Sequence, residues 1–367
     1  MRTGQGTIRN AAFLIFLAVL CAVSAGAQLT VGDNVNMNLT GNLGYSYTGA
    51  VGNGDINSTH GSGVTGDANL TGYYFHPNFL SFDVRPYYDR NQSSSDSQSI
   101  VRGTGIGSTV SLFGGSRFPG SVSYGLDFSN NSQFQVGGIS SVVGNSASQN
   151  FGISWSLLLP DRPHVTASYA IGSSNSSIEG LPQENASTSK TFSLNSGYQL
   201  AGWNLQGYLN NVRSHFSSVG FFTADRLSSG GSSTAFGASA QHVLPLHGSF
   251  SLGWGHSIYN PEDKSNGSDW TSSSYTAGAT FQPWSRLSIN QNVGYTTNLF
   301  SALERTVFQD GVLVPFNVDN GSHSLYLGTS ASLYIGHGFS VGSYFNHRMQ
   351  TFNDQDYSDS QYGATVN

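Results

Sequence analysis

The sequence predicts an all-β chain of antiparallel strands, and three observations carry this prediction. Apolar and polar residues alternate over segments of up to about thirteen residues, successive segments are joined by turn-rich connections, and charged residues make up only 9% of the chain against 13% aromatics. Alternation with a period of two places successive side chains on opposite faces of a strand. Each strand is therefore expected to have one apolar and one polar face.

The segment 34–49 shows the pattern in its simplest form. Val35 and Met37 share one parity, and Asn36 and Asn38 share the other. The same alternation recurs along the chain. It predicts strands within 63–74, 80–90, 106–112, 121–128, 150–159, 164–171, 191–200, 203–210, 233–244, 249–259, 274–281, 286–295, 323–335 and 339–347, with the start of another in the last seven residues.

The first residues predict a cleaved secretory leader. Arg2 and Arg9 supply its positive charge, and residues 11–23 form an apolar run too short for a comfortable membrane span. Ala-Gly-Ala at 25–27 is a small-x-small cleavage site. We therefore expect residues 1–27 to be removed on export.

The remaining residues, 28–367, are expected to form one domain without disulfides, because Cys21 is the only cysteine and lies in the leader. Loss of the two leader arginines leaves 12 basic against 20 acidic residues, which changes the formal net charge from -6 to -8. Nucleic-acid binding requires a basic surface, so the composition argues against a nucleic-acid partner.

A membrane barrel explains the alternation better than a soluble sandwich does. The predicted strands are long enough to cross a bilayer at a tilt. Aromatic residues crowd their ends, for example at Tyr45, Tyr47 and Trp284, as in the aromatic girdles of membrane barrels. The polar parity carries Ser, Thr, Asn and Gln instead of the charge that a soluble face of this size needs. We expect a transmembrane antiparallel up-and-down β-barrel of about 16 strands.

The lengths of the connections predict how this barrel is oriented in the membrane. Short turns such as 76–79 and 201–202 alternate with long polar connections, which is typical of tight periplasmic turns and long extracellular loops. The first connection is long, so we expect a periplasmic N-terminus. About seven residues remain for a sixteenth strand, and the chain ends on Asn367 instead of an aromatic residue. Either the chain is a fragment of a larger barrel or its last strand is atypical.

As a whole, the pattern resembles the porin-like outer-membrane β-barrels of Gram-negative bacteria. The resemblance rests on pattern and topology and not on a residue motif. It implies a location in the outer membrane, contact with its lipid, insertion by the barrel assembly machinery and, often, passive diffusion of small hydrophilic solutes. The oligomeric state is left open.

Several polar-parity residues are candidates for the lumen of such a barrel. Asp83 and Arg85 form either a mixed-charge patch in the pore or a structural salt bridge, and Asp67 and Asp83 are possible neighbours. Because carboxylates outnumber the single arginine, an open pore should mildly prefer cations. The complete set of candidates is Asn36, Asn38, Asp67, Asp83, Arg85, Asp89 and Asp127.

The segment from about 296 to 321 contains an unusual apolar run for a loop. Val312, Leu313, Val314 and Phe316 could form a constriction or plug if the loop folds inward, or a partner-binding surface if it projects outward. A non-conducting barrel, whose loops are the functional surface or which surrounds an inserted partner, is thus the alternative to a channel.

No motif indicates catalysis. The sequence lacks G-x-S-x-G and H-E-x-x-H, and the glycines of 103–107 lie in a strand pattern with no helix after them. His242 and His256 have no further ligand at metal-binding spacing, which favours aromatic-girdle or rim positions for both. We expect no enzyme activity, no cofactor and no metal site.

Overall fold

In a computed structural model of the chain, the described residues form strands joined by turns and bends. The described residues contain no α-helix. They therefore include no helix that is long and apolar enough to span a bilayer. The described ranges are 25–31, 33–51, 58–94, 97–135, 142–180, 184–219, 226–245, 247–262, 269–298, 321–336, 339–352 and 355–366.

Seventeen strands make up the described residues. The first nine are β1 (Ala25–Val31), β2 (Val35–Val51), β3 (Ser58–Tyr74), β4 (Leu80–Ser94), β5 (Ser97–Leu112), β6 (Gly120–Gln135), β7 (Val142–Leu157), β8 (His164–Ile178) and β9 (Glu184–Leu200). The other eight are β10 (Trp203–Val219), β11 (Arg226–Leu244), β12 (Gly248–Pro261), β13 (Trp270–Trp284), β14 (Leu287–Thr297), β15 (His323–Gly336), β16 (Phe339–Phe352) and β17 (Gln355–Val366).

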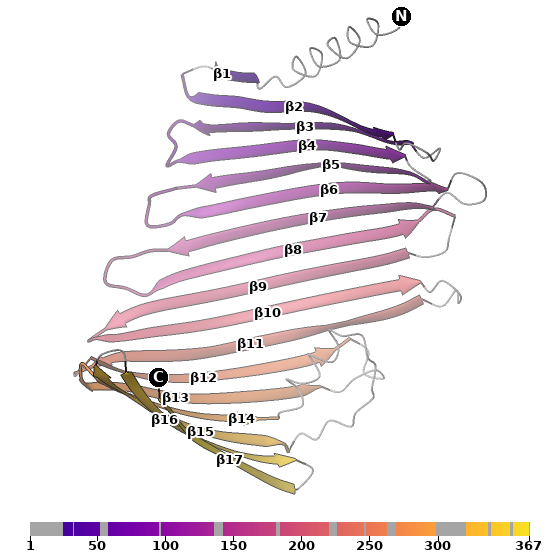
Figure 1. Cartoon of the computed structure of the whole chain (residues 1–367). Coiled ribbons are helices and arrows are strands. Elements are labelled where there is room, and N and C mark those ends of the chain that lie inside the picture. The colour runs from indigo at the N-terminus through magenta and orange to yellow at the C-terminus, as the bar shows by residue number, and fades with distance from the viewer. Residues whose placement is uncertain are drawn as a thin grey trace, which may run out of the picture. The chain divides into compact units, whose positions relative to one another are not determined.

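The strands follow an up-and-down order. From β1 to β7, and again from β11 to β17, each strand pairs antiparallel with the next one along the chain. Figure 1 shows β2 to β6 side by side in this order. The predicted all-β antiparallel up-and-down fold is therefore confirmed, and β2 to β17 match the expected number of about 16 strands.

The extra strand, β1, lies at the predicted cleavage site. It begins at Ala25 and pairs with β2 through a tight turn that brings Val31 opposite Val35. Residues 1–24 lie outside the described residues. The leader over 1–27, and the single domain over 28–367, stay predictions.

The chain divides into two compact units. The first contains β1 to β6 and most of β7, and the second contains β12 to β17. In the second unit the register places Trp254, Tyr275 and Tyr295 in one row of the apolar face. The other face of the same strands carries partners such as Thr276 and Gly294. The two-faced strand is thus common to both units.

The strands are longer than alternation alone predicted. β4 continues to Ser94 and β5 begins at Ser97, so most of the expected polar loop between them is strand. Likewise β17 has 12 residues, not seven. Alternation marks only the part of a strand that has one apolar face. Where both faces are polar the backbone ladder continues but the sequence signal disappears.

Very few apolar side chains are buried within the chain. Trp270, at 6% exposure, is the one buried hydrophobic residue among those described, whereas Leu43 is 58% and Tyr47 63% exposed. A soluble sandwich buries its apolar parity between two sheets. Here the apolar faces are covered by no second layer of described residues, which is the arrangement of strands that meet lipid.

Candidate pore-lining face

The register joins the polar parity of β2 to β7 into one continuous face. Directly opposed residues of neighbouring antiparallel strands point to the same side of a sheet. Successive partners can therefore be followed across the strands. One such row runs Asn42, Asp67, Tyr87, Gly105, Asp127 and Ser148.

All seven predicted lumen-lining residues lie on this face, which we call the polar face. Asn38 of β2 is opposite Thr71 of β3, which in turn is opposite Asp83 of β4, so these three residues form a second row of the same face. Asp89 is opposite Thr65. Asn36 and Arg85 share the parity of Asn38 and Asp83, and Asp67 and Asp127 belong to the row given above. The alternation in the sequence therefore predicted correctly that these seven residues share one face.

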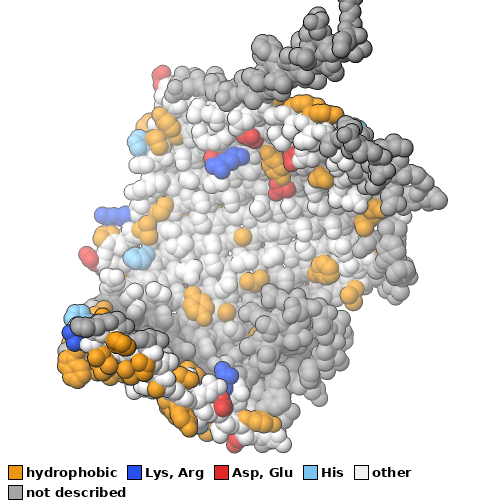
Figure 2. Space-filling model, viewed as in Figure 1, with side chains coloured by type: hydrophobic (Ala, Val, Ile, Leu, Met, Phe, Trp, Pro, Cys, Tyr) orange, Lys and Arg blue, Asp and Glu red, His pale blue; other side chains and the backbone are white. Residues whose placement is uncertain are grey.

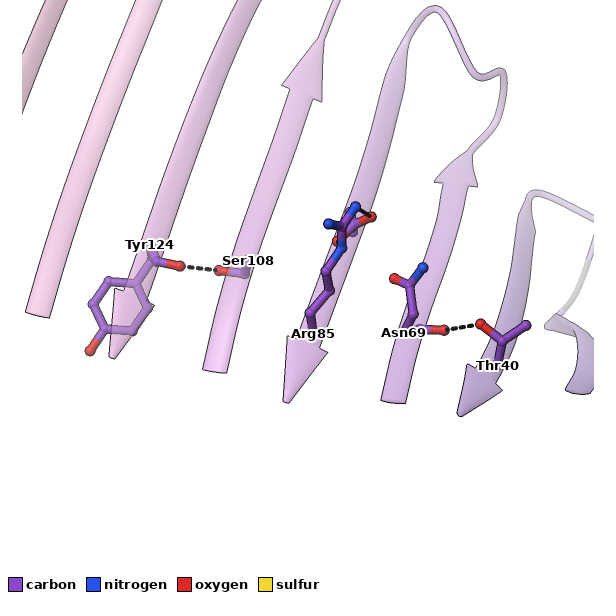
Figure 3. A network of polar contacts seen from close by, with 6 residues as sticks. Thr40, Asn69, Arg85, Ser108 and Tyr124 are labelled. Carbon is purple, nitrogen blue, oxygen red and sulfur yellow. Dashed lines mark hydrogen bonds and ion pairs between the residues drawn. The ribbon is translucent and has the colours of Figure 1, made fainter. Parts of the chain in front are cut away.

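Asp83 and Arg85 form a bidentate ion pair within β4. Arg85 Nε lies 2.6 Å from Asp83 Oδ1, and Arg85 Nη2 donates a hydrogen bond of 2.7 Å to Asp83 Oδ2. Figure 3 shows Arg85 beside Asn69 of β3. Because both partners are on one strand, the pair ties no two strands together. This favours the mixed-charge patch over the structural salt bridge that the sequence left as an alternative.

Tyr87 bridges two strands across a glycine. Its hydroxyl donates a hydrogen bond of 2.7 Å to Asp127 Oδ1, which belongs to β6, two strands away. The intervening residue on β5 is Gly105, where an added Cβ would lie 2.6 Å from the Tyr87 ring and 2.5 Å from Asp127 Oδ1. The absence of a side chain at Gly105 therefore makes room for the bridge. Sequence reasoning missed Tyr87, although its position on the parity of Asp83 and Arg85 was visible.

The remaining two aspartates are bonded to neutral donors. Asn42 donates to Asp67 Oδ2 at 3.2 Å, and Asn91 donates to Asp89 Oδ1 at 2.9 Å. A neutral donor leaves the carboxylate its negative charge, so only Asp83 is compensated by a cation. Over β3 to β6, Figure 2 shows one basic group with acidic groups around it on a mostly uncharged surface.

The expected contact between Asp67 and Asp83 is not direct. Asp67 is opposite Tyr87, whereas Asp83 is opposite Thr71, four residues farther along β3. The HPNF turn between the strands set this register, and its length could not be converted into a pairing from sequence alone. The two carboxylates belong to the same face but to different rows.

The apolar face carries an aromatic belt at the short-turn end of the first unit. Phe79 contacts the rings of Tyr74, Phe75 and Phe113, with centroids 6.4, 6.4 and 5.6 Å away. Phe113 in turn contacts Trp155 at 6.1 Å. These rings confirm that aromatics gather at the ends of strands, as in the interfacial girdles of membrane barrels.

The two histidines considered as metal ligands have aromatic and hydroxyl partners. His242 stacks on Trp203 at 4.7 Å, and His256 Nδ1 lies 2.8 Å from Ser273 Oγ. Within the described ranges no group of three or more His, Cys, Asp or Glu residues could hold a metal ion. Val312, Leu313, Val314 and Phe316, the predicted constriction, lie outside the described residues.

Comparison with known proteins identifies an architecture. No family model and no curated protein matches the sequence. Among solved structures, the alcaligin outer-membrane receptor FauA from Bordetella pertussis aligns with a TM-score of 0.51 at 13% identity, over 94% of this chain and 64% of the receptor. The chain thus spans less than two thirds of the length of this receptor.

Two further solved structures align with lower TM-scores. The ferric yersiniabactin uptake receptor FyuA from Yersinia pestis has a TM-score of 0.44 at 11% identity, over 93% of this chain and 62% of the receptor. OccK5 from Pseudomonas aeruginosa has a TM-score of 0.31 at 10% identity, over 91% of this chain and 98% of OccK5.

At 13% identity, the likeness to FauA concerns the fold alone. It agrees with the up-and-down antiparallel strands, with their exposed apolar faces and with the aromatic belt. The location in the outer membrane stays a prediction. The chain shares its architecture of antiparallel up-and-down strands with this outer-membrane receptor.

Proposed function

We propose that this protein is a porin-like channel through which small hydrophilic solutes diffuse passively across the outer membrane, with a mild preference for cations. The observation that carries the proposal is the polar face of β2 to β7. This face consists mainly of uncharged polar residues and glycines, and it also carries four aspartates and one arginine. Sixteen strands are enough to enclose an aqueous lumen, whereas eight are not.

The charges of this face support the cation preference. Arg85 neutralises Asp83, with which it makes the bidentate pair. Asp67, Asp89 and Asp127 are bonded to Asn42, Asn91 and Tyr87, all neutral donors. Three negative charges therefore remain uncompensated within this face. Rings or rows of carboxylates attract cations into a pore, and salt screens this attraction.

Planar-bilayer recording tests the channel. The refolded protein should give discrete conductance steps, and a salt gradient should give a reversal potential of the sign that cation selectivity requires. The variant D67N/D89N/D127N should lose most of that potential. D161N is the matched control, since Asp161 lies in an exposed short turn between β7 and β8.

The result that would overturn the channel is folded protein that inserts but never conducts. Folding is checked independently by the heat-dependent gel mobility of membrane barrels and by far-UV circular dichroism. Such a result would favour the alternative, a non-conducting barrel that acts through its loops or an inserted partner. An unchanged reversal potential in the triple variant would leave the channel standing but contradict the role given to the three aspartates.

A further inference from the structure

The apolar face of the first unit contains two arginines in directly opposed positions. Arg90 of β4 pairs with Arg102 of β5 in the register. Both have the parity of Val84 and Ile106, not that of Asp83 and Arg85. The row to which they belong runs Tyr45, Val64, Arg90, Arg102, Asn130 and Asn145 across β2 to β7.

This row lies near the long-loop edge of the apolar band, because the next row beyond it is mixed and contains Tyr47, Gln92 and Ile100. Toward the short turns, the next row contains Tyr88 and Phe128, whose side chains are 39% and 47% exposed. The opposite edge of the band is the row of Val35, ten residues along β2 from Tyr45. Ten residues span about 33 Å along a strand, or roughly 25 Å of membrane thickness at a tilt of about 40°. The arginines are therefore at the level of lipid headgroups.

The two guanidinium groups have no carboxylate partner in the described part of the chain. The one ion pair among the described Lys and Arg residues joins Arg85 to Asp83 on the other face. Like charges directly opposite each other on neighbouring strands destabilise a sheet. An anion between Arg90 and Arg102 would remove this repulsion.

Hydrogen-bonding amides adjoin the arginines. Arg102, Asn130 and Asn145 line a hollow of about 260 Å³. Within it Asn130 Nδ2 donates to Asn145 Oδ1 at 2.6 Å, and Asn130 Oδ1 accepts a hydrogen bond of 2.9 Å from Ser132 Oγ of the same strand. Glu184 is the one acidic residue among those that line the hollow. These polar side chains are unexpected on a face that otherwise meets hydrocarbon.

We propose that Arg90 and Arg102 together bind the terminal phosphate of an anionic lipid headgroup, in the membrane leaflet at the long-loop end of the strands. Guanidinium groups bind phosphate oxygens in a bidentate manner. Two of them match the charge of a phosphate monoester. The acyl chains of the lipid would lie along the apolar face below, past Tyr88 and Ile106. The site is on the opposite face from the proposed pore and does not depend on conduction.

Native mass spectrometry of the full chain in detergent tests the site. The probes are phosphatidic acid and phosphatidylcholine with identical acyl chains, added in equal amounts. The wild-type protein should retain phosphatidic acid in preference, and R90Q/R102Q should bind it about tenfold more weakly, as expected when a charge-assisted contact is lost. R117Q removes the same charge from an exposed turn at the other end of the strands, and its preference should be unchanged.

Two further measurements make the outcome decisive. R90K/R102K keeps both charges without the planar fork, so it should fold like the wild type and bind phosphatidic acid with intermediate strength. Millimolar inorganic phosphate should fail to displace the lipid from the wild type, since the headgroup is held together with its chains. The proposal is overturned if R90Q/R102Q keeps the wild-type preference, if both lipids are retained equally, or if free phosphate displaces the lipid completely.

Discussion

The two faces of β4 each carry an arginine, but the two arginines have different surroundings. Arg85 lies on the polar face and is held by both oxygens of Asp83. Arg90, five residues later, lies on the apolar face opposite another arginine and has no carboxylate partner among the described residues. An odd separation along a strand is enough to reverse the face. Each charged side chain of the polar face has a hydrogen-bond partner within the protein, whereas we expect the two arginines of the apolar face to take a partner from outside the chain.

The largest effect should come from moving a charge between these faces. L70R places a guanidinium in the middle of the apolar band and should destabilise the folded protein by about 2–4 kcal/mol. T71R, at the next residue, points to the polar face, where its register partner is Asp83. It should change the free energy of unfolding by less than about 0.5 kcal/mol. Equilibrium unfolding from lipid vesicles measures both, and equal losses would contradict the face assignment.

The bridge across β5 can be broken without removing either partner. In G105A the new Cβ would meet Leu126 O at 2.6 Å as well as the Tyr87 ring, so backbone or ring must shift. We expect a loss of about 1–3 kcal/mol. G107A is the matched control, because a Cβ there meets no atom within 4 Å. If the two variants unfold alike in the same vesicle assay, the close packing around Gly105 is not a determinant of stability.

Ring contacts between aromatic side chains stabilise the short-turn end of the apolar face. F113A removes the ring that contacts both Phe79 and Trp155, and should cost about 1–2 kcal/mol. F113Y keeps the ring and should retain most of the stability. Thermal unfolding in vesicles of different headgroup composition gives the measurement. The F113A loss should be the same with or without phosphatidic acid, unlike the lipid response that we expect at Arg90 and Arg102.

The smallest effect on stability should come from the exposed ion pair of the polar face. Arg85 is 68% exposed, so R85Q and D83N should both leave the unfolding transition nearly unchanged. Their effects on a pore should have opposite signs. R85Q removes the one cation and should strengthen cation selectivity, while D83N leaves that cation uncompensated and should weaken it. If the reversal potential changes in the same direction in both variants, the charges of this pair do not set the ion selectivity.

The faces and the strand order could be predicted from the sequence because both depend on local patterns. A period of two is readable within one segment, and it assigned residues as distant as Asn36 and Asp127 to a common face. The ends of the strands could not be predicted in this way. Beyond the apolar band both faces are polar, so segments such as 91–94 and 97–99 look like loops although they are paired strand.

The sequence alone could not predict which residues are partners across neighbouring strands. Whether Asp67 meets Asp83 or Tyr87 depends on how two strands are aligned, and alignment is a non-local property that turns and side-chain packing decide together. The same holds for the hydrogen bond of Tyr87 to Asp127 across Gly105, and for the opposition of Arg90 and Arg102. Sequence by itself determined that each strand has a polar and an apolar face, because that requires only alternation along one strand. The tertiary structure decided which charges share a row, because a row exists only when strands are paired in a particular register.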